Sequence, residues 1–330
     1  MEIAWYLFKV TKYKLVFDSW PRKQASKEFD LEQFCANNYE EVRKIIDDKW
    51  LKHVCNEPGC KERLIVIDGN EKCYRMICSA KKEKIQSSKG DVNRYNVCIR
   101  NPIRGNQHVK ASKYCELHQD EQSLISSETK LDLRPHTRLF CKNLPEVLTS
   151  EEGCKAEQNV DKFYNRTAGL FYFFRSCGVR LSHWEMYTHE SLSSVFTYLV
   201  DLFGDNPAHH ISGIVYDRAC DLHPFVTRLA REGNNIAKQY EMLHYVVDIF
   251  HVEKHTQPKC ALGNVECMYH PDLEKFNHFR KMNTEIAEQS FSRLNPYKYI
   301  TRKMSYAKRL MFLKFIDDMY NSVRVKKFKY

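Results

Sequence analysis

The sequence predicts a mixed α/β protein, in which the strands of a central sheet alternate with helices along the chain. Three short apolar runs, in 64–67, 210–217 and 243–250, have the length and the β-branched content of buried strands. An amphipathic pattern over 190–204 predicts a helix between them, and Gly204 is placed to end it. Together these features indicate a sheet with helices packed against it.

A helix and a hairpin are predicted ahead of the other elements. Apolar residues at helical spacing over 39–51 predict a helix within a helical segment that covers 1–50. The stretch RLIVIDGN (63–70) contains a buried strand and ends in a Gly-Asn turn, and EKCYRMIC (71–78) alternates like a partner strand. We therefore expect a hairpin with Asp68 at the end of its first strand.

The rest of the chain contains one polar insert and further elements of the sheet and its helices. Residues 79–135 are rich in Lys, Ser and Asn, which predicts an irregular insert. The stretch TAGLFYFFRSCGV (167–179) predicts another strand, 224–243 a helix, and 283–322 a helical and basic C-terminal segment. Residues 136–165 show no clear pattern.

The composition is typical of a soluble globular protein with a polyanionic partner. Apolar residues make up 43% of the 330 residues and charged residues 28%, which argues against a disordered chain. No run of 18 apolar residues predicts a membrane span, and the start lacks the pattern of a signal peptide. The net charge of +10 favours nucleic acid as the partner.

Acidic residues end several of the predicted strands. Asp68, Asp217 and Asp248 each lie at or near the end of an apolar run. A mixed α/β layout can bring such carboxylates from separate strands to one edge of the sheet. Carboxylate clusters of this kind bind Mg²⁺ or Mn²⁺, and two such ions support phosphodiester chemistry.

Two further carboxylates lie in the late helix predicted for NTEIAEQSFSRL (283–294). On a helical wheel Glu288 falls next to Phe291, at the border of the apolar face, whereas Glu285 falls well away from that face. A metal-binding carboxylate should be shielded but reachable. The helical phase therefore favours Glu288 over Glu285.

Thirteen cysteines and fourteen histidines indicate metal ligands or buried thiols more than disulfides, because the chain shows no secretory signal and the cysteine count is odd. The first group offers seven candidate ligands for one or two tetrahedral zinc sites: Cys55, Cys60, Cys73, Cys78, Cys98, Cys115 and His118. Zinc would stabilise a polar insert that has little core of its own.

A second group of candidate zinc ligands follows Asp217. His251 and His255 are four residues apart, so that on a helix they share a face and could bind one ion. The completing pair is either Cys220 with His223 or Cys260 with Cys267, and the spacing does not choose between the two.

Basic and aromatic residues alternate in KYITRKMSYAKR (298–309) and RVKKFKY (324–330), a pattern that suits phosphate contacts and base stacking. Four side chains that follow the Glu288 helix are candidates for DNA binding: Lys298, Arg302, Lys303 and Arg309.

Four stretches, in this order and spacing, resemble the Kyakuja-Dileera-Zisupton (KDZ) family of eukaryotic DNA transposases. They are RTAGLFYFFRSCGV (166–179), ESLSSVFTYL (190–199), YDRACDLHPF (216–225) with VDIFHVEKH (247–255), and NTEIAEQSFSRLNPYKYITRKMSYAKR (283–309). The resemblance implies an RNase H-like mixed sheet with helices, and an Asp-Asp-Glu metal triad that cuts and joins DNA in the nucleus.

The resemblance also implies roles for single residues. Asp217 of YDRAC matches the second acid, and Asp68 is the best match to the first. EQSFS (288–292) resembles the ERxFS helix of the related hAT transposases, with Gln289 in place of Arg, and points to Glu288 as the third acid. SKYCELH (112–118) resembles the cysteine clusters associated with KDZ transposases.

These observations favour a transposase core that uses Mg²⁺ or Mn²⁺ for DNA cleavage and strand transfer and Zn²⁺ for structure, with DNA and a second copy of itself as partners. The alternatives are a domesticated or truncated, catalytically silent zinc- and DNA-binding factor, and a zinc-bearing nuclease of other origin. The expected organisation is a helical segment over 1–50, a hairpin with the zinc cluster over 51–125, the core with a second zinc site over 126–322, and a basic tail over 323–330.

Overall fold

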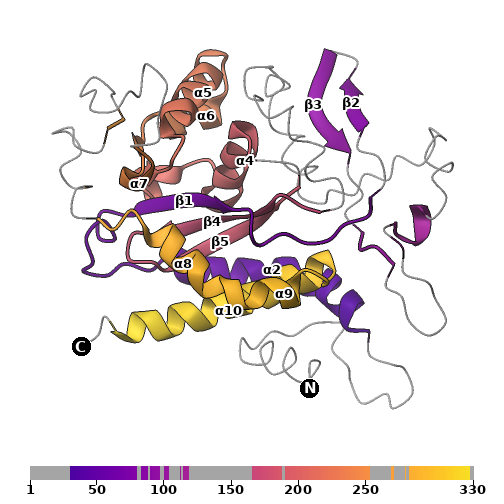
Figure 1. Ribbon diagram of the computed structural model, residues 1–330. Coiled ribbons are helices and arrows are strands. Elements are labelled where there is room, and N and C mark those ends of the chain that lie inside the picture. The colour runs from indigo at the N-terminus through magenta and orange to yellow at the C-terminus, as the bar shows by residue number, and fades with distance from the viewer. Residues whose placement is uncertain are drawn as a thin grey trace.

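A five-stranded mixed sheet separates two layers of helices in the computed structural model (Figure 1). The structure describes residues 30–79, 83–87, 90–96, 100–103, 112, 114–118, 166–187, 190–252, 269–270, 279 and 282–327. The strand order is β5-β4-β1-β6-β7. Their bounds are β1 Leu64–Asn70, β4 Gly169–Arg175, β5 Arg180–Met186, β6 Gly213–Val215 and β7 His244–Val246.

The direction of the strands changes at β1. This strand pairs antiparallel with β4 and parallel with β6, while β4 and β5 are antiparallel and β6 and β7 parallel. The apolar run of β1 and all of β4 are buried, as expected for strands covered on both faces. The predicted mixed sheet is therefore confirmed.

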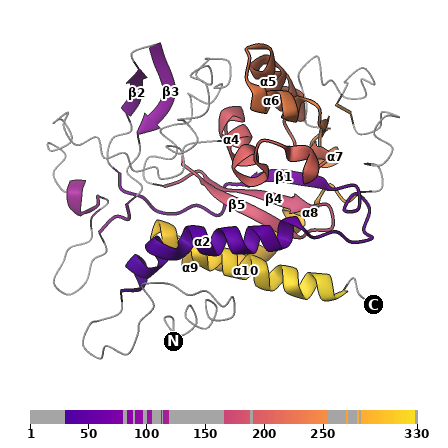
Figure 2. The same ribbon diagram turned by 180° about the vertical axis from the view of Figure 1, so that it is seen from behind.

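Helices cover both faces of the sheet (Figures 1 and 2). One layer holds α4 (Leu192–Phe203), α5 (Ala219–Arg231) and α6 (Asn235–Glu241), and the other holds α2 (Leu31–Leu51), α8 (Ile286–Leu294) and α10 (Tyr306–Lys327). Shorter elements are α7 (Ile249–Val252), α9 (Lys298–Thr301) and the 3₁₀ turns η1 (Glu116–His118), η6 (Pro207–His209) and η9 (Asn295–Tyr297). A separate hairpin consists of β2 (Glu83–Ser87) and β3 (Gly90–Asn96). Among the described helices, none has the length and apolarity to cross a membrane.

Local signals define two of the helix ends. Gly204, at φ +69°, ends α4 as predicted, and its N–H bonds to the Val200 carbonyl. The stretch 224–243, predicted as one helix, is instead two, because Gly233 at φ +97° breaks it between α5 and α6. Asn234 then caps α6 by accepting a hydrogen bond from the backbone of Ala237.

The predicted hairpin between 63–70 and 71–78 is wrong. The chain turns after β1, where the Cys73 N–H bonds to the Asn70 carbonyl, but the following residues form only an isolated bridge from Met76 to Arg166. Both edges of β1 are occupied by β4 and β6 instead. Every residue of β4 is buried, whereas Glu71 and Lys72 after Asn70 are exposed, so β4 is the better apolar partner for a strand covered on both faces.

Candidate functional site

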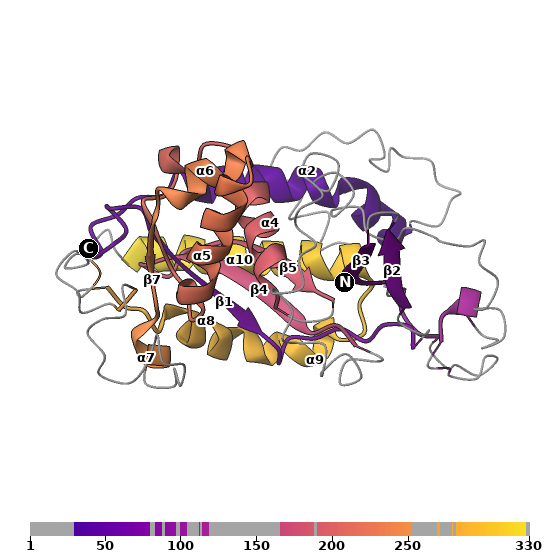
Figure 3. The same ribbon diagram turned by 90° about the horizontal axis from the view of Figure 1, so that it is seen from above.

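Three acids lie at one level across neighbouring parallel strands. Val66 pairs with Val215 between β1 and β6, and Asp68 and Asp217 each follow two residues later. The pairing of β6 with β7 places Asp248 at the same level on the next strand. Neighbouring strands lie about 4.8 Å apart, so the strand ends gather these acids at one edge of the sheet. Figure 3 shows α7 and α8 on this side of the molecule.

Helix α8 brings Glu288 to this edge. The helix packs against β1 and β4 and buries Ile286 and Ala287 against the core. The Glu288 side chain is 36% exposed, whereas Glu285 lies on the exposed side of the helix. The two glutamates therefore differ in burial as the helical phase predicts.

A buried arginine fixes the position of α8. The Arg180 side chain of β5 donates to the Ser290 hydroxyl at 2.8 Å and to the Ser290 carbonyl at 3.1 Å. The same guanidinium donates to Asp317 of α10 at 2.9 Å. Ser290 lies two residues after Glu288, so this contact holds the helix where Glu288 faces the strand ends.

Glu190, just before α4, is a further acid at this site. A Cβ atom added at Gly69 would lie 2.2 Å from its Oε2 atom, so the missing side chain makes room for this carboxylate beside β1. The Tyr216 hydroxyl donates a hydrogen bond to its Oε1 atom. Burial and, to a smaller extent, the charge of Asp217 together raise the pKa of Glu190 to about 7.

Asp68 experiences the same crowding of negative charge. Burial raises its pKa well above the usual value, and the charges of Glu190, Asp217 and Glu288 add to this increase. The Gly69 N–H donates to Asp68 at 2.7 Å and opposes the shift only in part. The three predicted acids and Glu190 thus act on one another electrostatically at the sheet edge.

Among the described residues, Asp248, His251 and Glu288 place ligand atoms within 4.8 Å of one another, in a group that includes neither Asp68 nor Asp217. His251 Nδ1 is 2.9 Å from Asp248, and its Nε2 is 3.9 Å from Glu288. The hydrogen bond to Asp248 raises the pKa of His251, and burial raises that of Glu288. Asp248 thus orients the His251 ring.

The chemistry of this donor set fits a hard divalent cation. Carboxylate oxygens are the ligands that Mg²⁺ and Mn²⁺ prefer, and mutual repulsion between them favours any bound positive charge. The Glu288 Oε2 atom is buried and has no hydrogen-bond partner in the part of the chain that the structure describes. A buried carboxylate oxygen without a hydrogen-bond partner fits the role of a cation ligand.

A thiol–imidazole cluster forms in the insert. The Cys78 and Cys115 sulfurs each lie 3.4 Å from His118 Nδ1, and the Cys115 N–H donates to the Cys78 sulfur at 3.2 Å. This cluster could hold a metal such as zinc. Cys73 lies apart from it in the turn after β1, and Cys98 lies outside the described residues.

Cys55 and Cys60 do not join the cluster of the insert. They lie together near His53 and Cys177, which the sequence did not single out. The first group of predicted ligands is therefore divided between two places in the fold.

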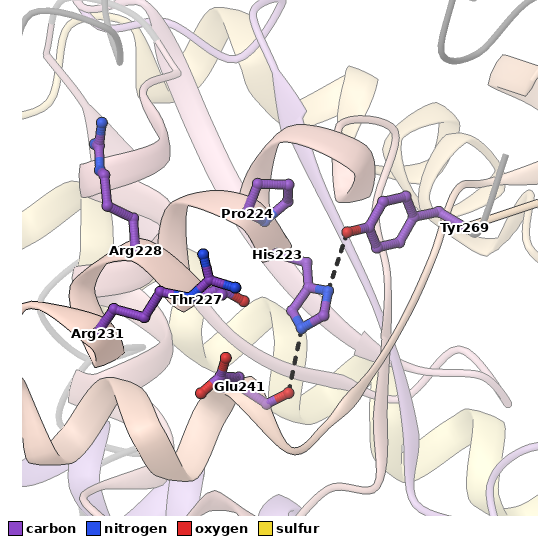
Figure 4. A pocket seen from close by; sticks show the side chains of 7 residues that line it. All are labelled: His223, Pro224, Thr227, Arg228, Arg231, Glu241 and Tyr269. Atoms are coloured by element: carbon purple, nitrogen blue, oxygen red, sulfur yellow. Dashed lines mark hydrogen bonds between the residues drawn. The ribbon is translucent and has the colours of Figure 1, made fainter.

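His223 lies in a pocket of about 440 Å³ on the α5 and α6 side of the molecule (Figure 4). Its Nε2 donates to the Glu241 carbonyl at 3.2 Å, and its Nδ1 accepts from the Tyr269 hydroxyl at 3.1 Å. Both ring nitrogens are thus engaged. The structure does not group His223 with Cys220, which is buried on α5, in a metal cluster among the described residues.

The second predicted zinc site otherwise falls on residues that the structure does not describe. His255, Cys260 and Cys267 all lie outside the described residues. His251, the remaining member, belongs to the acidic edge. The ligand pairing around this segment stays a prediction.

Three of the four predicted DNA-binding residues are accessible. Lys298 and Arg302 are partly exposed and Lys303 is exposed, in the segment that follows α8. The Arg302 guanidinium lies 4.1 Å from the ring centre of Tyr74 and 5.0 Å from that of Tyr299. This arrangement presents cations beside aromatic rings, as the sequence pattern indicates.

The assignment of Arg309 to DNA binding is wrong. Its side chain is completely buried and donates to Glu185 and to the Cys73 carbonyl. Glu185 also binds Arg75 at 2.8 Å. Arg309 therefore compensates a charge in the core and cannot reach a phosphate.

Sequence reasoning missed four residues of these sites: Glu190, His53, Cys177 and Arg180. His53 and Cys55, separated by one residue beside Cys60, were a detectable ligand pattern. Nothing local marked Glu190 or Arg180, because their roles depend on partners that only the fold brings near.

Comparison with known families gives one match. The model described as Kyakuja-Dileera-Zisupton transposase matches residues 62–321, which is most of the chain. The matched span includes every strand of the five-stranded sheet and all the acids at its edge. Comparisons with curated proteins and with solved structures found no match.

Proposed function

The chain belongs to the Kyakuja-Dileera-Zisupton transposase family, and on this premise we propose that it is the core of a transposon-derived DDE-type transposase that cleaves DNA and joins the cut end to a target. One observation carries the proposal. Acids from separate strands and from α8 lie at one sheet edge, where burial and, after it, their mutual repulsion raise the pKa values of Asp68, Glu190 and Glu288.

Asp68, Asp217 and Glu288 would hold two Mg²⁺ or Mn²⁺ ions. When bound, such ions activate water and stabilise the leaving oxygen of a phosphodiester. Glu190 adds negative charge beside Asp68 and Asp217 and so increases the affinity of the site for cations. The contact of Arg180 with α8 keeps Glu288 aimed at the strand ends.

His251 modulates the charge of the site. Asp248 holds its ring so that Nε2 lies 3.9 Å from Glu288. Because the pKa of His251 is raised, its cationic form persists to higher pH than that of a free imidazole. In that form it offsets part of the negative charge around Glu288.

Lys298, Arg302 and Lys303 would bind the DNA backbone. They lie in the segment that directly follows α8, the helix that carries Glu288. Their contacts with phosphates would place the duplex without reading its sequence. DNA binding should weaken with salt, because each neutralised phosphate releases a counterion.

The remaining parts of the proposal follow from the family. We infer an RNase H-like sheet, supported by the mixed strand order and the helices on both faces, and action in the nucleus on DNA, with self-association. The cluster of Cys78, Cys115 and His118 would bind a structural zinc ion, with Cys98 as a candidate fourth ligand. A silent DNA-binding factor is the alternative, and the intact acidic edge favours catalysis.

A nicking assay on supercoiled plasmid tests the proposal, with Mn²⁺ or Mg²⁺ and without added divalent metal. We expect metal-dependent nicking that falls more than about 100-fold in Asp217→Asn and Glu288→Gln, because each variant loses a charged ligand. Glu285→Gln is the matched control, since it removes an exposed glutamate from the start of the same helix.

Two outcomes contradict the catalytic proposal. Nicking that survives in both Asp217→Asn and Glu288→Gln would remove these residues from the metal site. A folded wild-type protein that binds the plasmid but never nicks it would establish the silent binding factor.

A further inference from the structure

A second thiol–imidazole cluster lies at the opposite end of β1 from the acids. His53 and Cys55 follow α2, Cys60 lies in the loop before β1, and Cys177 lies in the turn between β4 and β5. One ligand atom from each of the four residues lies within 4.8 Å of all the others. Three segments that are distant in the sequence thus converge on one point.

We propose that His53, Cys55, Cys60 and Cys177 bind one Zn²⁺ in a closed, structural site. With zinc bonds of about 2.3 Å to sulfur and about 2.0 Å to nitrogen, a tetrahedral site separates its nitrogen and sulfur ligands by about 3.5 Å. The Cys177 sulfur lies 3.5 Å from His53 Nε2. Four protein ligands leave no open position for a reacting water, so the role is structural rather than catalytic.

The loop before β1 has a backbone suited to this convergence. Gly59 adopts φ +79°, and a Cβ atom there would lie 2.8 Å from the Met282 sulfur and 3.0 Å from the Ser176 hydroxyl. Only glycine lets the loop approach the β4–β5 turn this closely. The next residue, Cys60, is completely buried against that turn.

The turn that carries Cys177 is equally constrained. The Arg175 N–H bonds to the Val179 carbonyl, and the Gly178 N–H bonds to the Arg175 carbonyl. Gly178 adopts φ +84°, which glycine tolerates without strain. Cys177 is only 2% exposed, so its sulfur is held inside the cluster rather than toward solvent.

The surroundings also match the charge of such a site. Zinc with three thiolates and a neutral imidazole carries a net charge of −1. The buried Arg175 guanidinium donates to three backbone carbonyls and, within the described residues, contacts no carboxylate.

A zinc ion here would join the end of α2 to the loop that enters β1 and to the β4–β5 turn. Metal binding stabilises a fold when the ligands come from separate segments, because the unfolded chain offers no assembled site. His53 and Cys177 are 124 residues apart. The site would therefore stabilise the entry into the strand that carries Asp68 without contacting the acids.

The decisive measurement is the zinc content of the full chain by elemental mass spectrometry. We expect Cys60→Ser and Cys177→Ser each to lose one zinc per chain relative to wild type. Cys35→Ser, which alters a buried cysteine of α2 outside the cluster, should lose none. Cys115→Ser should lose a different zinc, so that adding Cys177→Ser to it lowers the count again.

A second measurement does not depend on the folding of the cluster variants. X-ray absorption at the zinc edge of Cys115→Ser should show three sulfurs at about 2.3 Å and one nitrogen at about 2.0 Å. Unchanged zinc in folded Cys60→Ser and Cys177→Ser, a spectrum without sulfur, or a Cys60–Cys177 disulfide in the intact mass of wild type would overturn the proposal. None of these results depends on whether the protein nicks DNA.

Discussion

Two regions of this protein bury charge in opposite ways. Where α10 packs against β5, opposite charges meet: Glu185 binds both Arg75 and Arg309, and Arg180 binds Asp317. At the carboxyl ends of β1, β6 and β7, acids lie beside other acids. The same sheet therefore has one region where charges cancel and another where they accumulate.

The pKa values reflect this difference. Burial pushes the pKa of Glu185 upward, but the charges of Arg75 and Arg309 outweigh it and hold the pKa below its usual value. At the acidic edge burial and neighbouring charge act in the same direction on Asp68 and Glu190. The paired charges therefore stabilise the folded state, because each buried charge has its counterion. The clustered acids destabilise the folded state, and a bound cation would offset that destabilisation.

The largest loss of stability is expected from removing Glu185, the shared anion of the paired region. Glu185→Gln leaves the cations of Arg75 and Arg309 buried without their anion, and should lower the free energy of unfolding by about 3–5 kcal/mol in urea titrations. Glu40→Gln is the control, because it removes an exposed partner of Arg43 and should cost less than about 1 kcal/mol. Equal losses in the two variants would contradict the distinction.

At the acidic edge, removing a carboxylate should raise the free energy of unfolding rather than lower it. The pKa of Glu190 is about 7 in the folded protein and 4.5 in a free side chain, so the folded state keeps its proton longer. Stability should then fall as pH rises from about 4.5 to 7, by at most about 3 kcal/mol. Glu190→Gln should be stabilising at pH 8 and neutral at pH 5.

This comparison needs urea unfolding in buffers without Mg²⁺ or Mn²⁺, and without a chelator that would remove structural zinc. The quantity to compare is the difference between variant and wild type at each pH. If the difference in the free energy of unfolding between Glu190→Gln and wild type is the same at pH 5 and pH 8, the folded state does not hold the Glu190 proton to higher pH than the unfolded state. That result would contradict the prediction.

A divalent cation should stabilise the folded protein at the acidic edge. Mn²⁺ at 100 times its dissociation constant should add about 2.7 kcal/mol to the free energy of unfolding at pH 8. The gain should shrink at pH 5, where Glu190 is protonated, and in Asp217→Asn. A gain that Asp217→Asn retains in full would place the cation elsewhere.

The smallest effect is expected from removing one of the accessible cations Lys298, Arg302 and Lys303. Lys303→Ala should leave stability nearly unchanged, because the side chain is exposed. It should weaken plasmid binding and reduce the slope of log affinity against log salt by about 1, since one phosphate contact is lost. Lys52→Ala, another exposed lysine far from α8 in sequence, should leave the slope unchanged.

The sequence by itself predicted the features that depend on residues close together in the chain. The apolar runs predicted β1, β4, β6 and β7, and Gly204 predicted the end of α4. The acids at the strand ends needed only the rule that parallel strands share an edge. The burial of Glu288 and the exposure of Glu285 followed from the period of one helix.

Only the tertiary structure decided which groups act together. Arg309 looked like a surface cation in its own segment, but Glu185, 124 residues away, draws it into the core. No local pattern marked Glu190. The strand β1 pairs with β4 rather than with the neighbouring stretch 71–78. Hydrophobic periodicity depends on adjacent residues, whereas strand pairing, charge compensation and metal coordination depend on partners that the folded chain alone brings together.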